Sequence, residues 1–171
     1  IYARFLRTMG EPLLPYSMAL WIVRIILIVA LVAHVVTVVK LAAHNRAARP
    51  TPYAHHTFDQ ASWSARMMLA SGVLLLGFIV IQILQFTTGT VDVTPILEGK
   101  VYANLYFAFP KWYFALLYVT AMAMLGFHLY HGAWSLFQTL GIDNPDRNRP
   151  LRIFAIVAAA VVFLGFSSVP V

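Results

Sequence analysis

Four long apolar segments alternate with short polar ones along the 171-residue chain. A membrane-spanning helix needs about 20 mostly apolar residues, and each segment supplies that length. The predicted spans cover residues 15–40, 66–87, 112–140 and 151–171. The pattern therefore predicts an all-α integral membrane protein, a single transmembrane helix bundle over residues 1–171 in contact with the lipid bilayer. Residues 87–111, which contain Gly, Pro and Asp, are predicted to form an irregular connection.

The composition excludes several function classes. Hydrophobic residues make up 61% of the chain and charged residues only 11%, against about 25% charged in soluble domains. The net charge of +6 lies in short segments between apolar runs, so membrane topology explains it and nucleic acid is not an expected partner. The absence of cysteine rules out disulfides, covalently attached haem and a cluster bound by this chain's cysteines alone. The six histidines are then the candidate metal ligands.

The basic residues predict the orientation of the chain. They concentrate in the segments 40–66 and 143–152, which the positive-inside rule places in the cytoplasm. The N-terminus then lies outside. The opening segment, Tyr2 to Glu11, has no signal-peptide pattern and is expected to be either a short amphipathic surface helix or a linker. Whether a longer chain precedes Ile1 is left open.

Three histidines lie inside predicted spans: His34 in the first, His128 and His131 in the third. An imidazole within a lipid-spanning segment is costly, which favours a functional role. Counted from the inner helix ends, His34 is about 9 Å deep and His128 about 15 Å deep. Two imidazoles at similar depth predict one bis-histidine haem b. The alternative is that these histidines only form hydrogen bonds between helices.

Other polar positions have several interpretations. His131, on nearly the same helix face as His128, could be the alternative ligand, a propionate partner or part of a quinone pocket. Arg24 could snorkel to the headgroups or contact a cofactor propionate. Gln82 and Gln85 are expected to form hydrogen bonds within the bundle. Gln82 is about 24 Å from the inner face and so belongs to an outer level.

The run FHLYHGAWSLFQTLG, residues 127–141, resembles the cytochrome b membrane-anchor subunit of succinate dehydrogenases and quinol:fumarate reductases. In that family a ligand histidine is followed four residues later by Gly and thirteen residues later by the end of a Trp-Gly or Leu-Gly pair. Here His128, Gly132 and Gly141 have that spacing. Residues 34–53 are similar to the family's second helix and its basic exit loop. Residues 62–72, SWSARMMLASG, are similar to the start of its third helix.

This resemblance implies a membrane anchor that passes electrons between an iron–sulfur subunit, itself bound to a flavoprotein subunit, and a membrane quinone. It implies a haem b ligated by His34 and His128 and a quinone expected to be menaquinone, in the respiratory chain and tricarboxylic acid cycle of a bacterial plasma membrane. The chain itself would carry out no succinate chemistry. Candidate quinone residues are Trp63, Ser64, Arg66 and His131.

The chain departs from the family pattern in two places. The family usually has five helices, so its first helix is missing here or is supplied elsewhere, for example by a small extra membrane subunit. Gln82 replaces a histidine of the family's outer haem, so at most one haem is expected.

Three alternatives stay open. Two histidines here and two cysteines of a small partner would form a Rieske-type [2Fe–2S] site. The chain could instead be the cytochrome b anchor of a formate dehydrogenase or nitrate reductase. A non-redox transporter or scaffold is disfavoured because the acidic residues lie outside the predicted spans.

Overall fold

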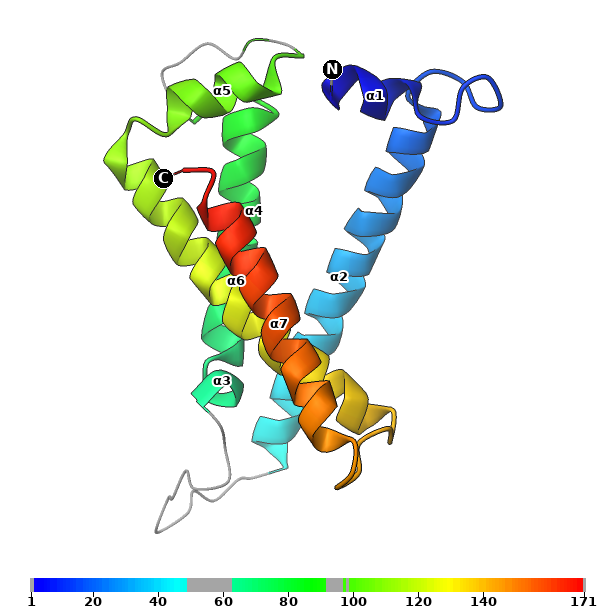
Figure 1. The fold of residues 1–171 in the computed structure, drawn as a ribbon, viewed down its shortest axis with the longest axis vertical. Coiled ribbons are helices and arrows are strands. Elements are labelled where there is room, and N and C mark those ends of the chain that lie inside the picture. Colours follow the sequence, from blue (N-terminus) through cyan, green and yellow to red (C-terminus); the bar gives the residue numbers. More distant parts are fainter. Residues whose placement is uncertain (1, 49–62, 92–96, 98, 171) are drawn as a thin grey trace. The chain divides into compact units, whose positions relative to one another are not determined.

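The computed structural model describes residues 2–48, 63–91, 97 and 99–170 (Figure 1). Across these ranges the chain forms seven helices and no strand. They are α1 Tyr2–Thr8, α2 Met18–Ala47, α3 Trp63–Arg66, α4 Met68–Phe86, α5 Val101–Ala108, α6 Trp112–Thr139 and α7 Asn148–Ser167. Four of them, α2, α4, α6 and α7, are long and apolar enough to cross a membrane. The predicted all-α class and the four spans are confirmed, and the chain is a multi-pass membrane protein.

The chain divides into two compact units, each of which is described by itself. One contains α1 and α2, and the other contains α3, α4, α6, α7 and nearly all of α5. The prediction of a single domain stays a prediction. In the first unit α2 continues to Ala47, beyond the span end predicted at Lys40. Leu41 and Ala42 are good helix formers, so the helix continues beyond the end of its apolar segment.

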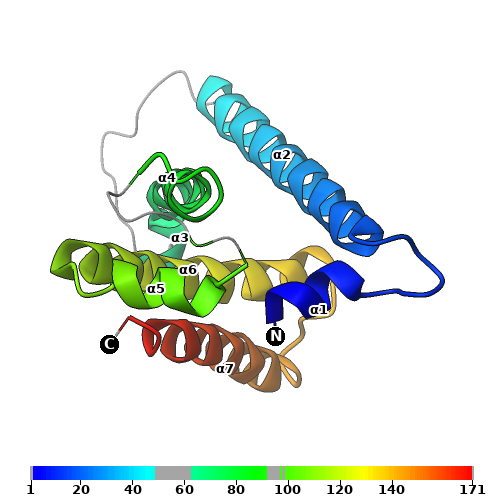
Figure 2. The ribbon, with the colours of Figure 1, turned by 90° about the horizontal axis from the view of Figure 1, so that it is seen from above.

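In the second unit α6 lies between α4 and α7 (Figure 2). Small residues let α6 and α7 approach closely, as is common between membrane helices. Ala121 of α6 and Ala155 of α7 have no exposed surface. A Cβ added to Gly126 would lie 3.5 Å from the Cβ of Phe163 on α7. Side chains larger than Ala at Gly126 would therefore separate the two helices.

The contact between α4 and α6 forms an antiparallel seam. The buried residues of α4 are Ser71, Phe78 and Gln85, spaced seven apart, and a seven-residue repeat keeps one helix face on its partner. Ser71 meets His128 near one end, and Phe78 meets Tyr118 ten residues earlier on α6. We call these the His128 end and the Tyr118 end of the α4–α6 seam. They lie about 15 Å apart along α6.

The boundaries of the other helices follow local sequence signals. Helix α6 ends at Thr139, next to the predicted end at residue 140, and Gly141 follows with φ 65°: its N–H donates to the Gln138 carbonyl, and the N–H of Ile142 donates to the Phe137 carbonyl. Helix α7 begins at Asn148, earlier than predicted, because a proline is tolerated in a first turn. The connection predicted to be irregular contains α5, whose eight residues include neither Gly nor Pro.

Candidate cofactor site

His128 is held by a hydrogen bond from the neighbouring helix. The Oγ of Ser71 lies 3.1 Å from the Nδ1 of His128. Ser71 is only 1% exposed, so its hydroxyl is enclosed by α4 and α6. The same oxygen is 3.0 Å from the carbonyl oxygen of Met68, one turn earlier in α4. A fully buried serine thus connects the imidazole to the backbone of α4.

One tautomer of His128 satisfies both contacts of Ser71. A serine hydroxyl has one proton, and the contact with the Met68 carbonyl uses it. The Ser71 oxygen then accepts the Nδ1 proton of His128 when the imidazole carries its proton on that nitrogen. In this tautomer the lone pair is on Nε2. A metal-binding histidine is commonly held in this way, with one nitrogen donating to a second group and the other binding the metal.

Gly72 leaves room for the imidazole beside α4. A Cβ added to Gly72 would lie 3.6 Å from the Cε1 of His128, which is ordinary van der Waals contact. The ring therefore lies against a short stretch of α4 whose side chains are small. A side chain larger than that of alanine at this position would push the imidazole away from the helix.

The remaining candidates of the second unit lie near the same end of the seam. Trp63 of α3 packs edge-on against Phe127, with ring centroids 4.7 Å apart, directly before His128. Ser64 is buried, and Arg66 is exposed at the end of α3. His131 is half-buried on α6. Trp63 is thus brought to the helix segment that carries His128, and it is itself half-exposed.

Two candidates belong to the first unit. His34 lies in the middle of α2, and Arg24 lies one and a half turns after its start. The guanidinium carbon of Arg24 is 5.1 Å from the centre of the Trp21 ring, a cation–π contact. Because the units are described separately, pairing of His34 with His128 stays a prediction.

The Tyr118 end of the seam is built from aromatic side chains. Phe78, Phe86 and Phe109 all pack edge-on against Tyr118, at centroid distances of 4.9, 6.4 and 4.9 Å. The amide of Gln82 approaches the Tyr118 hydroxyl without reaching hydrogen-bonding geometry. Gln85 forms no hydrogen bond among the described residues, so the expected bond within the bundle is absent for this residue.

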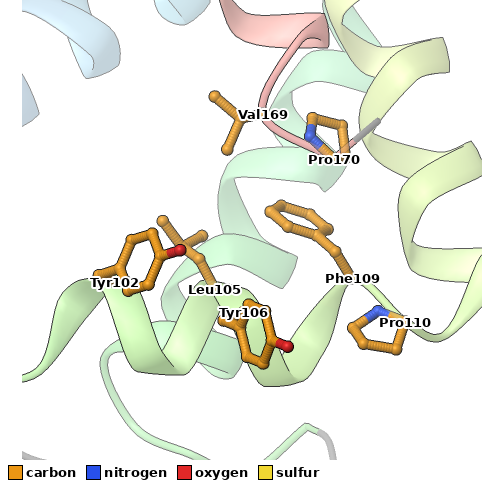
Figure 3. Close-up of a pocket in the computed structure, with 7 residues that line it drawn as sticks. All are labelled: Tyr102, Leu105, Tyr106, Phe109, Pro110, Val169 and Pro170. Atoms are coloured by element: carbon orange, nitrogen blue, oxygen red, sulfur yellow. The ribbon is translucent and has the colours of Figure 1, made fainter.

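A pocket of about 320 Å³ lies beside this aromatic cluster (Figure 3). Figure 3 shows it between α5 and the segment that follows α7. Its walls are Tyr102, Leu105, Tyr106, Phe109, Pro110, Val169 and Pro170. The tyrosines of α5, Tyr102 and Tyr106, are highly exposed, and tyrosine is enriched at membrane–water interfaces.

Sequence reasoning missed Ser71 and Gly72 as site residues. Both occur in the segment that resembles the family's third helix, but neither carries an unusual chemical group. The available signal was the seven-residue spacing of Ser71, Phe78 and Gln85, which marks the face of α4 that meets a partner. Comparisons with family models, with curated proteins and with solved structures returned no match for this chain.

Proposed function

We propose that this chain is the membrane-anchor and electron-transfer subunit of a succinate:quinone oxidoreductase. The observation that carries the proposal is the hydrogen bond between Ser71 and Nδ1 of His128, because a metal-binding histidine is commonly oriented by such a bond at its other ring nitrogen. The sequence resemblance of residues 127–141 supports the same assignment. The four apolar helices make the chain a multi-pass helical membrane protein, as such an anchor would be.

The donor set suits a haem b. His34 and His128 would hold its iron, and Arg24 and His131 are candidates for its propionates. A haem held by two imidazoles would supply one-electron transfer. The chain's own residues would orient the ligand: Ser71 hydrogen-bonds to Nδ1 of His128, and Gly72 leaves space beside the ring. The aromatic packing around Tyr118 supports a single haem, since those side chains fill the Tyr118 end of the seam.

The quinone would bind near α3. Trp63 offers an indole N–H and an apolar face, and its ring is already positioned by Phe127. Ser64, Arg66 and His131 would supply further donors for the quinone carbonyls. In the proposed orientation the basic segments face the cytoplasm, where an iron–sulfur subunit and a flavoprotein subunit would dock. The compartment would be a bacterial plasma membrane.

The test is a dithionite-reduced minus oxidised spectrum of the purified complex, with a pyridine haemochrome count and identification of its hydrophilic subunits. We expect one haem b per chain, lost in His34→Ala and in His128→Ala. His44→Ala is the matched control, since His44 lies on α2 near its exposed end, and it should retain the haem.

Other results would redirect the proposal. Iron and acid-labile sulfide beyond the content of the soluble subunits, without haem, would replace haem by the shared [2Fe–2S] site. Hydrophilic subunits of a formate or nitrate enzyme would contradict the succinate assignment. A complex with neither signal would remove the electron-transfer role from these histidines.

A further inference from the structure

One face of α5 forms a wall of the pocket of about 320 Å³ that lies beside the Tyr118 end of the seam (Figure 3). The residues of this wall are three or four positions apart: Tyr102, Leu105, Tyr106 and Phe109. Such spacing places them on one side of a helix. The N–H of Phe109 donates to the Leu105 carbonyl, with 3.2 Å between nitrogen and oxygen, so the helical turn extends past Ala108. Val169 and Pro170, which follow α7, form the facing wall.

The pocket lies at the level where the spans of the second unit end. Helix α4 ends at Phe86, α6 begins at Trp112 and α7 ends at Ser167. Because neighbouring spans run antiparallel, these three ends lie on the same side of the bundle, and α5 lies across that side (Figure 1). All three helices are long and apolar enough to cross a membrane, so their ends mark the boundary between hydrocarbon and headgroups. The pocket is therefore at the depth of the lipid headgroups.

The walls combine apolar surface with two phenol hydroxyls. Among the described residues, those that line the pocket carry no charge, so the part of a ligand that enters it must be uncharged. The rings of Tyr102 and Tyr106 are stacked, with centroids 6.3 Å apart, and their hydroxyls can donate to ester or phosphate oxygens. Lys111 directly follows the wall residue Pro110 and adds a positive charge next to the pocket in the sequence. An apolar chain joined to ester oxygens and a phosphate matches these features.

We propose that this pocket binds one phospholipid. An acyl chain enters between α5 and the segment after α7, the hydroxyls of Tyr102 and Tyr106 donate to the ester oxygens, and Lys111 attracts the phosphate. The bound lipid also supports the seam, because Phe109 lines the pocket and packs against Tyr118 with ring centroids 4.9 Å apart. A ligand that binds only the folded protein stabilises it. The site does not depend on whether His128 binds haem.

Native mass spectrometry of the delipidated, purified complex, titrated with dioleoylphosphatidylglycerol, tests the proposal. Val169→Trp places an indole in the pocket, and we expect it to weaken the binding of one lipid by about ten-fold or more. Val161→Trp is the matched control, because it makes the same exchange at a position of α7 that is 65% exposed and lies outside the pocket. It should bind lipid as the wild type does. Replacing both Tyr102 and Tyr106 by Phe keeps the rings and should weaken the same lipid several-fold.

Three results would overturn the proposal. The first is equal lipid affinity in Val169→Trp and Val161→Trp. The second is displacement of the lipid by a lower concentration of a short-chain quinone, which would make the pocket a quinone site. The third needs no variant: a phosphatidylglycerol with a diazirine in its acyl chain should crosslink to Leu105 and Phe109, and unlabelled lipid should prevent this. Equal labelling of Phe107, an exposed residue of α5 outside the pocket, without such competition would show ordinary contact with the bilayer.

Discussion

The two ends of the α4–α6 seam use polar groups in opposite ways. At the His128 end, Ser71 and His128 form a closed chain of hydrogen bonds that ends on the Met68 carbonyl. At the Tyr118 end, Gln85 and Tyr118 are as well buried but have no such partners, and edge-on aromatic contacts hold the helices together. One end is arranged to orient an imidazole, and the other to pack.

This difference shows that burial alone does not identify a functional site. Ser71 and Gln85 occupy equivalent places in the seven-residue repeat of α4 and are both nearly inaccessible. What separates them is the hydrogen-bonding partner: an imidazole for Ser71, and none among the described residues for Gln85. Variants that change one end of the seam at a time test this difference.

The largest expected effect is the loss of the cofactor when the His128 end is broken. His128→Ala should abolish the haem b signal in the reduced minus oxidised spectrum, because one of the two proposed haem ligands is removed. Tyr118→Phe, at the other end of the same helix, should leave the signal at one haem per chain. Equal losses in both variants would mean that the effect is on folding and that the two ends do not differ in function.

The second prediction concerns packing at the Tyr118 end. Phe78→Ala opens a cavity against Tyr118. We expect the free energy of unfolding in mixed micelles to fall by roughly 2 kcal/mol, which is the contribution of the cavity that a large-to-small substitution leaves. The solvent-transfer part is omitted because the unfolded helices stay in an apolar medium. Phe166→Ala, on an exposed face of α7, is the matched control and should change little. A loss as large in the control would contradict the assignment of Phe78 to the core.

The third prediction concerns the orientation of the imidazole. Ser71→Ala removes the acceptor for the Nδ1 proton of His128, so the haem should be bound about 10- to 100-fold more weakly, as for other groups that orient a metal ligand. Haem retention during titration with an apo-haem acceptor protein measures this change. The midpoint potential is the second measurement, since a purely structural defect would lower haem content without altering the potential of the haem that stays bound. Ser135→Ala on α6 is the control.

The sequence predicted the helices well because membrane spans are long and their apolar runs are continuous. His34, His128 and Gln85 were all recognised as polar positions within spans. The pairing of Ser71 with His128 could not be predicted, because it depends on which face of α4 meets α6 and serine is common in membrane helices. Helix α5 was missed for a related reason: its eight residues have no apolar run long enough to stand out between flanking Gly and Pro.

The smallest expected effect is at Gly72, because the structure shows how much space lies between this residue and the imidazole ring of His128. A methyl group there would be in ordinary contact with the Cε1 of His128 at 3.6 Å, so Gly72→Ala should retain the haem. It should also stabilise α4 by about 1 kcal/mol, since alanine favours a helix over glycine. Gly72→Leu cannot be accommodated without displacing the imidazole, and its haem content should fall to the level of His128→Ala. Both variants are compared by haemochrome count and by unfolding in mixed micelles. The comparison distinguishes a steric displacement of the imidazole from a loss of the imidazole itself at the His128 end. If the alanine variant lost haem as completely as the leucine variant, the imidazole would have to lie closer to α4 than the seam described here allows.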